Sequence, residues 1–193
     1  GTAFLAGFIA KYWLEQFATA PAALDLPNDR PRPSNKTFNA AVESFVLDEK
    51  LFKDLKRLGA KNGATSFATL LAGFNVLLSR LSGQSDIVVA VPAAGQSAMG
   101  QDRLIGHCAN LLPIRSEVRS NESFEEYLKR TKKAVLDAYE HQNYTYGLLV
   151  QRLALPRDPS RSPLLSAMFN VDRSGFKGLD LGGLEIEITT NQK

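Results

Sequence analysis

The sequence predicts a mixed α/β layer fold. Segments with apolar residues at helical spacing alternate along the chain with short apolar runs that are typical of strands. The 193 residues, 44% of them hydrophobic, are enough to enclose a core, and no internal repeat or low-complexity tract interrupts them. We therefore expect one globular domain or two small lobes, with helices covering a mixed sheet.

The N-terminal part combines a predicted helix with a predicted linker. Residues 4–18 place aromatic and aliphatic side chains at helical spacing, and Pro21 ends the pattern. Residues 24–35 carry prolines without apolar periodicity, which favours an extended course over the surface. From Thr37 the pattern changes, and the alternation in residues 41–47 predicts a strand.

Two helices are predicted next from their end signals. Asp48 is a suitable N-cap for the first helix, and Gly59 is expected to close it. The second begins at Thr65 or Ser66 and stops at Gly83. It is apolar over most of its circumference, so we expect it to lie against a sheet.

The centre of the chain predicts two strands and a long helix. Residues 86–93 form an unbroken apolar run, as expected of a strand covered on both faces, and a second strand is expected within residues 104–115. Ser123 and Glu126 have the spacing of a capping box for a helix over residues 124–141.

The C-terminal part predicts a short helix and two strands. The helix covers residues 147–153 and precedes the proline-rich segment 156–165. Strands are expected at residues 165–171 and 184–190.

Composition argues against several classes of function. The formal net charge is only +3, and basic residues are scattered among acidic ones, so we expect no nucleic-acid partner. The single cysteine excludes an internal disulfide and a multi-cysteine zinc site. No stretch approaches the roughly 18 apolar residues of a membrane span, and no secretory signal opens the chain. We expect a cytoplasmic protein without a membrane partner, and the absence of an initiator methionine suggests an excerpt of a longer chain.

His107 and Cys108 resemble a reactive pair. In a strand, however, adjacent side chains point to opposite faces, so these two cannot bond to each other there. His141 could approach the cysteine from elsewhere, but a free cysteine is most often a small buried hydrophobe. The two histidines lack metal-binding spacing, so we expect no metal. Inert packing is the favoured interpretation of Cys108.

Gly106 and Asn110 have clearer physical roles in the same segment. Glycine allows a sharp turn or a close approach, and an amide on a strand can satisfy backbone groups of a neighbouring segment. For both residues we favour a structural role at the start of the strand over direct contact with a substrate. Residues 95–103 form a polar, glycine-flanked loop that is either a functional loop or a plain connector. They lack the strand, G-x-G-x-x-G and helix arrangement of a phosphate-binding loop.

The segment 157–165 predicts a turn. Pro159 and Pro163 forbid a helix, while Asp158 and Ser160 can bond nearby backbone amides. Arg157 and Arg161 could pair with acids across the turn, and the alternative is a turn whose charged side chains are solvated.

As an ordered set, several segments resemble the second half of nonribosomal peptide synthetase condensation domains. They are "YWLEQFATAPAALDLPNDRPRP", "LIGHCANLLPIR", "HQNYTYGLLV" and "RDPSRSPLLSAMFNV". The resemblance implies a chloramphenicol-acetyltransferase-like lobe, an α+β two-layer sandwich in which a mixed sheet is covered by helices. It implies that residues 1–36 are a helix and linker from the lobe junction, and that residues 37–193 are the C-terminal lobe.

The same resemblance implies amide-bond formation between acyl groups carried on phosphopantetheine arms. The family motif H-H-x-x-x-D-G does not occur, because neither His107 nor His141 has a histidine neighbour. We therefore assign no catalytic residue and expect the chain to be inactive without an N-terminal lobe that carries the motif. Other implied partners are peptidyl carrier proteins, which present the phosphopantetheine, and a neighbouring adenylation domain; no cofactor is expected to bind directly.

The resemblance also implies site residues. Those near the tunnel between the lobes are Gly95, Gln96, Gly106, His107 and Asn110. Those with structural roles in the signature segments are His141, Gln142, Arg157, Asp158, Ser160, Arg161 and Pro163.

The sequence departs from the family pattern near the tunnel floor. Gly95-Gln96 stands where many members have Gly-Arg or Asn-Arg, and His107 stands where an aromatic residue is common. Two alternatives therefore stay open. One is an epimerization domain or free-standing acyltransferase of the same superfamily, and the other is a non-catalytic module that docks carrier proteins.

Overall fold

The computed structural model describes residues 2–95, 100, 103, 105–106 and 108–172. Helices and strands follow in the order α1 (Thr2–Gln16), α2 (Glu49–Lys61), α3 (Ser66–Ser82), β1 (Asp86–Ala94), β2 (Ala109–Glu117), α5 (Phe124–Glu140), α6 (Tyr146–Leu153) and β3 (Ala167–Met168).

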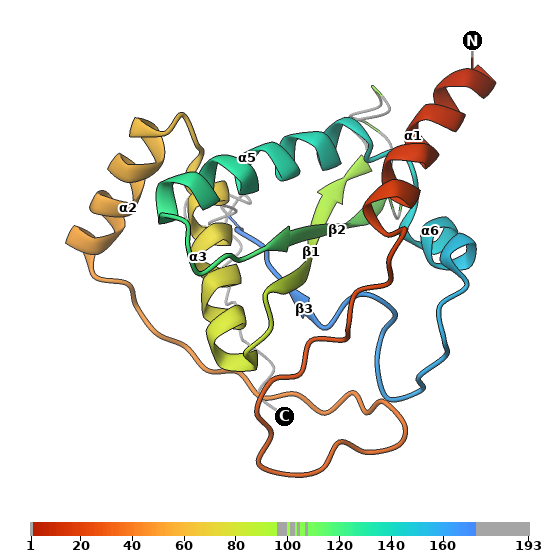
Figure 1. Ribbon diagram of the computed structural model, residues 1–193, viewed down its shortest axis with the longest axis horizontal. Coiled ribbons are helices and arrows are strands. Elements are labelled where there is room, and N and C mark those ends of the chain that lie inside the picture. The colour runs from red at the N-terminus through yellow and green to blue at the C-terminus, as the bar shows by residue number, and fades with distance from the viewer. Residues whose placement is uncertain (1, 96–99, 101–102, 104, 107, 173–193) are drawn as a thin grey trace, which may run out of the picture.

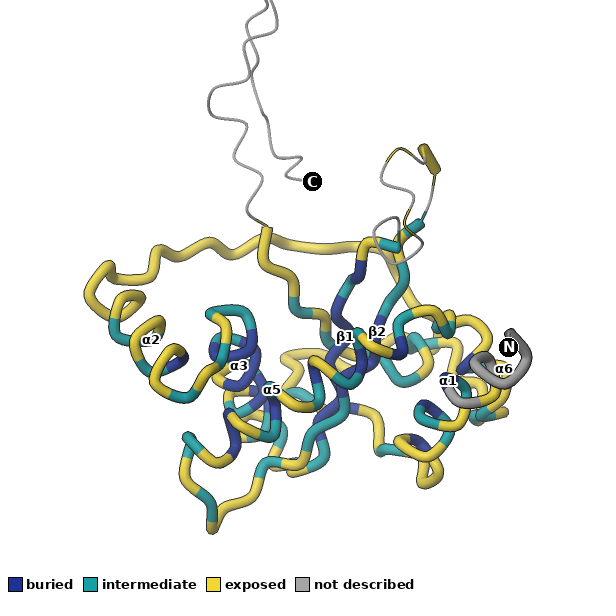
Figure 2. Tube along the Cα trace, turned by 90° about the horizontal axis from the view of Figure 1, so that it is seen from above, coloured by how far each residue is buried: buried dark blue, intermediate teal, exposed yellow. Residues whose placement is uncertain are grey.

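A mixed sheet lies at the centre of the molecule, in the order β2-β1-β3 (Figure 1). β1 and β2 pair antiparallel along their full lengths, and β3 pairs parallel to β1 through Val89 and Ala167. α3 packs on β1, α5 packs on both β2 and α3, and α1 lies against α6. Figure 2 shows α2 and α3 on one side of the β1–β2 pair and α1 and α6 on the other. The predicted mixed α/β fold is confirmed.

β1 supplies the centre of the core. Its apolar run is buried from Ile87 to Val91, because helices cover the sheet and strands flank it on both edges. Trp13 of the first helix and Phe17 just after its end belong to the same apolar cluster. The N-terminal helix is therefore packed into the core that the later elements form, while the predicted division at residue 36 stays a prediction.

The predicted N-caps of three helices are confirmed. The side chains of Asp48, Thr65 and Ser123 each accept a hydrogen bond from a backbone N–H in the first turn of the following helix. Gly83 closes α3 in the left-handed conformation, with φ 71°. These interactions are local, which explains why the sequence predicts them well.

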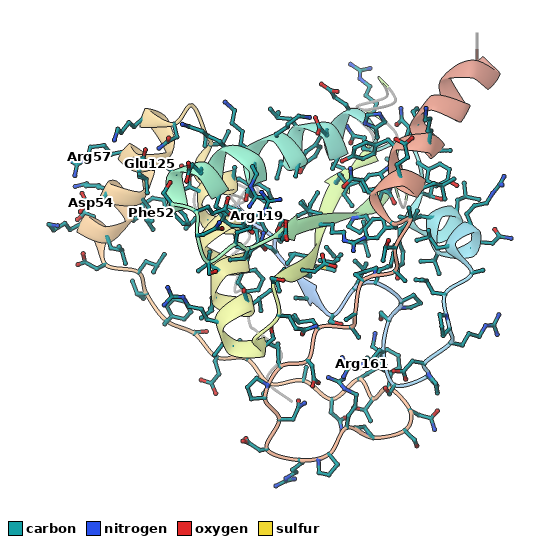
Figure 3. The ribbon with its side chains drawn as sticks, in the orientation of Figure 1. Phe52, Asp54, Arg57, Arg119, Glu125 and Arg161 are labelled. Carbon is teal, nitrogen blue, oxygen red and sulfur yellow. The ribbon has the colours of Figure 1, made fainter. Side chains whose placement is uncertain are left out.

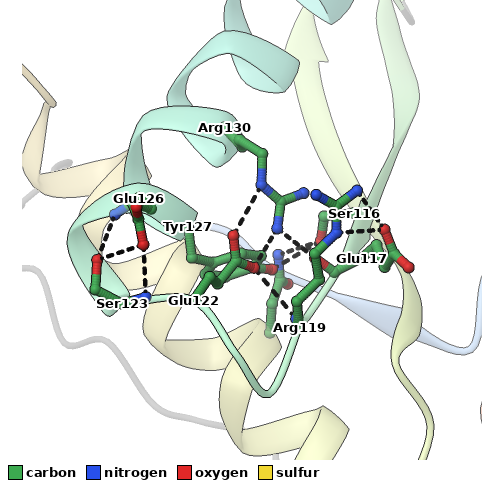
Figure 4. Close-up of polar contacts among 9 residues, drawn as sticks. Ser116, Glu117, Arg119, Glu122, Ser123, Glu126, Tyr127 and Arg130 are labelled. Atoms are coloured by element: carbon green, nitrogen blue, oxygen red, sulfur yellow. Dashed lines mark hydrogen bonds and ion pairs between the residues drawn. The ribbon is translucent and has the colours of Figure 1, made fainter.

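The start of α5 is held by a capping box and an adjoining ion-pair network (Figure 4). Ser123 N–H donates to Glu126 at 2.8 Å, and the N–H of Glu126 donates back to the Ser123 hydroxyl at 3.3 Å. Arg130 pairs with Glu122 and donates to the backbone oxygen of Glu117 at 2.7 Å. The turn between β2 and α5 is thus fixed from both ends.

Gly59 does not end α2, which continues to Lys61. This prediction was wrong because the glycine is required for helix packing instead of for a cap. A Cβ built at Gly59 would lie 2.4 Å from Thr69 Oγ1 of α3, closer than side-chain carbons approach other atoms. Gly59 therefore lets α2 and α3 meet at short range.

The strand predicted at residues 41–47 is absent, and the whole segment from Thr37 to Leu47 is irregular. No described residue pairs with this segment, and its apolar side chains face solvent: Phe38 is 92% exposed, Phe45 84% and Val46 96%. Alternation selects the faces of a strand but does not supply a hydrogen-bonding neighbour. Phe52 on the following helix is also exposed, and Figure 3 labels it beside Asp54 and Arg57 of α2.

The strand predicted at residues 165–171 is reduced to Ala167–Met168, followed by one further bond from Phe169 N–H to Ala90 O at 2.9 Å. Leu164 precedes it with φ 60°, so the chain turns sharply out of the proline-rich segment before pairing begins. The strand predicted at residues 184–190 lies outside the described residues.

Within the described part of the chain, no single helix is long and apolar enough to cross a membrane. α2 and α3 together meet the length and composition criteria, but they are bent by 107°. No group of three or more His, Cys, Asp and Glu side chains is placed to hold a metal ion, among the residues that the structure describes.

Candidate functional site

Segments far apart in the sequence surround an open cavity of about 560 Å³, which we call the Asn110 cavity. It lies where the ends of β1 and β2 meet the connection from α5 to α6. Its lining residues are Gly95, Cys108, Ala109, Asn110, Leu111, Gln142, Asn143, Thr145, Tyr146 and Gly147.

Asn110 holds this cavity together. Its Nδ2 donates to the backbone oxygens of Gln142 at 2.8 Å and Tyr144 at 3.1 Å. Its Oδ1 accepts from the backbone N–H of Tyr146 at 3.0 Å and from that of Leu111 at 2.9 Å. The predicted use of a strand amide to satisfy a neighbouring backbone is confirmed, and the neighbour is the α5–α6 connection.

Gly95 and Cys108 form the next close approach in the cavity wall. Gly95 N–H donates to Cys108 O at 2.9 Å. A Cβ at Gly95 would lie 2.2 Å from the same oxygen, so only glycine fits without a backbone shift. β2 starts at Ala109, one residue after the cysteine, so the strand begins later than predicted. Cys108 is half-buried, not fully enclosed.

The structure brings together some predicted tunnel residues and separates another. Gly95 and Asn110 line the same cavity, together with Gln142 from the third signature segment. Gly106 is exposed and is not among the lining residues, and nothing lies within 4 Å of a Cβ built there. Gln96 and His107 lie outside the described residues.

His141 is a packing residue beneath the first helix. Its ring stacks on Tyr12 with centroids 4.1 Å apart, and its Nδ1 lies 2.7 Å from Asp137 O. Its backbone oxygen accepts a 2.9 Å hydrogen bond from the Trp13 indole. Burial, followed by the charges of Asp137 and Glu140, raises the pKa of Tyr12 to about 12, so the stacked phenol is neutral at physiological pH.

The predicted turn in the proline-rich segment is confirmed. Asp158 Oδ1 accepts from Ser160 N–H at 2.8 Å and from the Ser160 hydroxyl at 2.6 Å. These hydrogen bonds, the hydroxyl first, lower the pKa of Asp158. Arg161 Nε lies 3.8 Å from Asp158, which confirms the expected pairing for Arg161, whereas the exposed Arg157 makes no ion pair with a described residue.

Two connections were not apparent from the sequence. Tyr146 Oη donates to Pro163 O at 2.6 Å, which ties the rim of the Asn110 cavity to the proline-rich turn. Arg115 makes a two-point contact with Asp86 and donates to Gln16 O and Thr19 O, which anchors the end of α1 on the sheet. For the contacts of Arg115, the one signal in the sequence was a single arginine within an apolar strand.

The Asn110 cavity has no described carboxylate, imidazole, ammonium or guanidinium group in its lining. Its ionisable side chains are those of Cys108 and Tyr146, and burial raises the pKa of Tyr146, which keeps the phenol protonated at neutral pH. The described lining offers backbone groups, amides and hydroxyls. Such groups orient a substrate by hydrogen bonds but supply no strong base at pH 7.

Solved structures with this arrangement define the class of fold. The chain superposes on holo-AB3403, a four-domain nonribosomal peptide synthetase, with TM-score 0.80 and 24% identity, covering 83% of this chain and 12% of that one. It superposes on the X-domain from teicoplanin biosynthesis with TM-score 0.77 and 24% identity, covering 84% and 36%. The fold is that of condensation domains, the chloramphenicol-acetyltransferase-like fold.

Sequence comparison identifies the family. The profile described as "Condensation domain" matches residues 9–188, and the chain belongs to this family. It is 41% identical to surfactin synthase subunit 1 of Bacillus subtilis (strain 168) over 84% of its length, and 38% identical to gramicidin S synthase 2 of Brevibacillus brevis over 86%. The chain spans about 4% of the length of these relatives. The family resemblance predicted from the signature segments is confirmed.

Proposed function

We propose that this chain is the C-terminal lobe of a condensation domain that joins carrier-tethered aminoacyl and peptidyl groups through amide bonds. In this proposal, residues 37–193 form the lobe and residues 1–36 come from the lobe junction. The partner N-terminal lobe carries the H-H-x-x-x-D-G motif, and the acceptor and donor groups arrive on phosphopantetheine arms of peptidyl carrier proteins. An adenylation domain adjoins the complex, which works in the cytoplasm.

The observation that carries the proposal is the chemistry of the Asn110 cavity. Its wall joins the ends of β1 and β2 to the α5–α6 connection through one amide, and its described lining holds no carboxylate, imidazole or amine that could act as a base. A cavity of this kind can confine and orient acyl chains, whereas proton transfer from an attacking amine requires a group from elsewhere. A lobe that orients the substrates, while another lobe supplies the proton-transferring group, fits this arrangement.

The exposed apolar side chains support the proposal that this chain contacts other protein segments. Phe38, Phe45 and Val46 lie almost fully in solvent. Exposed apolar patches of soluble proteins commonly mark interaction surfaces. The proposal places further parts of a synthetase next to the lobe.

A condensation assay with aminoacyl carrier thioesters tests the proposal. Residues 1–193 alone should form no dipeptidyl thioester, and the same residues joined to an N-terminal lobe with the histidine motif should form it. Replacing the second histidine of that motif by alanine in the joined protein provides the control. Condensation by residues 1–193 alone would refute the assignment of catalysis to the other lobe.

A non-catalytic docking module is the second candidate. The chain superposes with TM-score 0.75 and 25% identity on the X-domain in its complex with OxyB from teicoplanin biosynthesis, covering 81% of this chain. A fold of this class therefore binds another protein in that complex. Tight carrier binding combined with no condensation in the joined two-lobed protein would favour this function.

A further inference from the structure

A second cavity, of about 320 Å³, lies between the linker and the proline-rich turn; we call it the linker notch. Its lining includes the basic residues Arg32, Lys36 and Arg161 and the serines Ser160, Ser162 and Ser166. It is distinct from the Asn110 cavity, with which it shares no lining residue. Figure 3 shows Arg161 among the loops beneath the sheet, where these two segments lie.

Hydrogen bonds fix both walls of the linker notch. Lys36 N–H donates to Pro159 O at 2.8 Å, and Lys36 Nζ donates to the Ser162 hydroxyl at 2.9 Å. Arg161 Nη1 donates to Leu24 O at 2.8 Å, and its side chain is only 19% exposed. The two segments therefore hold a defined separation and present their polar groups to one space.

The described lining carries one sign of charge. Arg32, Lys36 and Arg161 contribute cations, and no aspartate or glutamate is among the lining residues. Arg161 pairs with the carboxylates of Asp25 at 3.5 Å and Asp158 at 3.8 Å, and both distances are longer than a direct charge-assisted hydrogen bond. One carboxylate oxygen of Asp158 also accepts hydrogen bonds from the backbone N–H and the hydroxyl of Ser160. Asp158 also interacts electrostatically with Arg32, so Arg161 and Arg32 are partly compensated, whereas no described carboxylate forms an ion pair with Lys36.

Hydroxyl donors complete the arrangement. Ser162 and Ser166 line the notch beside the cations, while the hydroxyl of Ser160 already donates to Asp158. A tetrahedral anion with several acceptor oxygens matches lysine, arginine and hydroxyl donors that converge from two walls. A single carboxylate would leave much of this donor set without an acceptor.

We infer that the linker notch binds a phosphate group, either as the free anion or as a phosphate ester. Lys36 provides a point charge, Arg32 a guanidinium, and the hydroxyls of Ser162 and Ser166 provide neutral donors. The anion site does not depend on the condensation activity. Only the ester form, in which the phosphate belongs to a carrier-borne phosphopantetheine arm, rests on the proposed function.

Titration of the full chain with inorganic phosphate, followed by backbone NMR shifts and calorimetry, tests the site. We expect saturable binding, with shifts concentrated at residues 32–39 and 158–166. Lys36→Gln should weaken binding about tenfold, since a hydrogen bond to a charged group is lost. Arg30→Gln is the matched control, because Arg30 lies on the same linker but lines a different cavity, and it should leave the affinity unchanged.

Titrations with 4′-phosphopantetheine and with pantetheine distinguish the source of the phosphate. Tighter binding of the phosphorylated arm than of inorganic phosphate identifies the ester as the ligand, and equal affinity identifies the free anion; either result supports the site. Equal binding of pantetheine and its phosphate overturns it. So does an affinity for phosphate that Lys36→Gln leaves unchanged while the variant retains the wild-type amide spectrum elsewhere.

Discussion

Asn110 on β2 reaches across to Tyr146 at the first turn of α6, where its side-chain oxygen accepts the backbone N–H at 3.0 Å. The same side chain donates to the backbone oxygens of Gln142 and Tyr144. One amide thus sets the position of a whole connection relative to the sheet.

Replacing Asn110 by alanine should lower the free energy of unfolding by about 2–4 kcal/mol, because partly buried backbone groups lose their partner. Urea unfolding measures the change. Asn143→Ala is the matched control, since Asn143 lines the same cavity but is exposed, and it should stay within about 0.5 kcal/mol of wild type. Equal losses for both variants would contradict the anchoring role.

Gly95→Ala should be destabilising by about 1–3 kcal/mol, because the new Cβ would lie 2.2 Å from Cys108 O and the strand ends would have to separate. Gly106→Ala provides the comparison, since a Cβ there meets nothing within 4 Å. Thermal unfolding of the two variants distinguishes a packing requirement at one position from a general cost of losing glycine. A Gly95→Ala variant as stable as Gly106→Ala would show that the loop adjusts freely.

The fold was predictable from sequence where the determining interactions are local. The caps of Asp48, Thr65 and Ser123 join residues three apart, so a short window contains the whole signal. The strand predicted at residues 41–47 failed because pairing depends on a neighbour that no local pattern supplies. Gly59 was misread for a related reason, since its partner Thr69 lies on the next helix.

The candidate site was predictable in its residue types but not in its partners. The amide of Asn110 could be expected to satisfy a neighbouring backbone, yet nothing in the sequence names Gln142 and Tyr144 as its acceptors. The bond from Tyr146 to Pro163 O joins two signature segments that the sequence presents separately. Such contacts depend on how the chain returns to the sheet, which is set by the whole fold.

Gly59→Ala and Gly73→Ala should change stability in opposite directions, although both place alanine inside a helix. At Gly59 the new methyl would lie 2.4 Å from Thr69 Oγ1, so α2 would have to move away from α3 at a cost of about 1–3 kcal/mol. At Gly73 nothing lies within 4 Å, and the helix should gain about 0.5–1 kcal/mol from the lower flexibility of alanine. Chemical unfolding measures both, and a stabilised Gly59→Ala variant would contradict the close approach.

The capping box predicts a pH dependence of stability. Hydrogen bonds from the Ser123 backbone N–H and then from its hydroxyl lower the pKa of Glu126 from its ordinary value of 4.5. Because the folded pKa lies below the unfolded one, this stabilisation is fully present above pH 4.5 and is lost as the pH falls through the folded pKa. Unfolding free energies from pH 3 to 6 should therefore rise less steeply in Glu126→Gln than in wild type. An identical slope would exclude a stabilising role for the carboxylate.

Cys108→Ala in an intact, two-lobed enzyme should lower the melting temperature more than it lowers turnover per folded molecule. The bond that closes the cavity wall uses the cysteine backbone oxygen, which the substitution keeps, while the half-buried thiol contributes packing. The expected destabilisation is about 1 kcal/mol, and turnover per folded molecule should change less than about twofold, or 0.4 kcal/mol. Cys108→Ser is the comparison, because it keeps the size but replaces the sulfur by a more strongly hydrated hydroxyl. A large loss of turnover with unchanged melting in both variants would instead assign the thiol a direct part in the reaction.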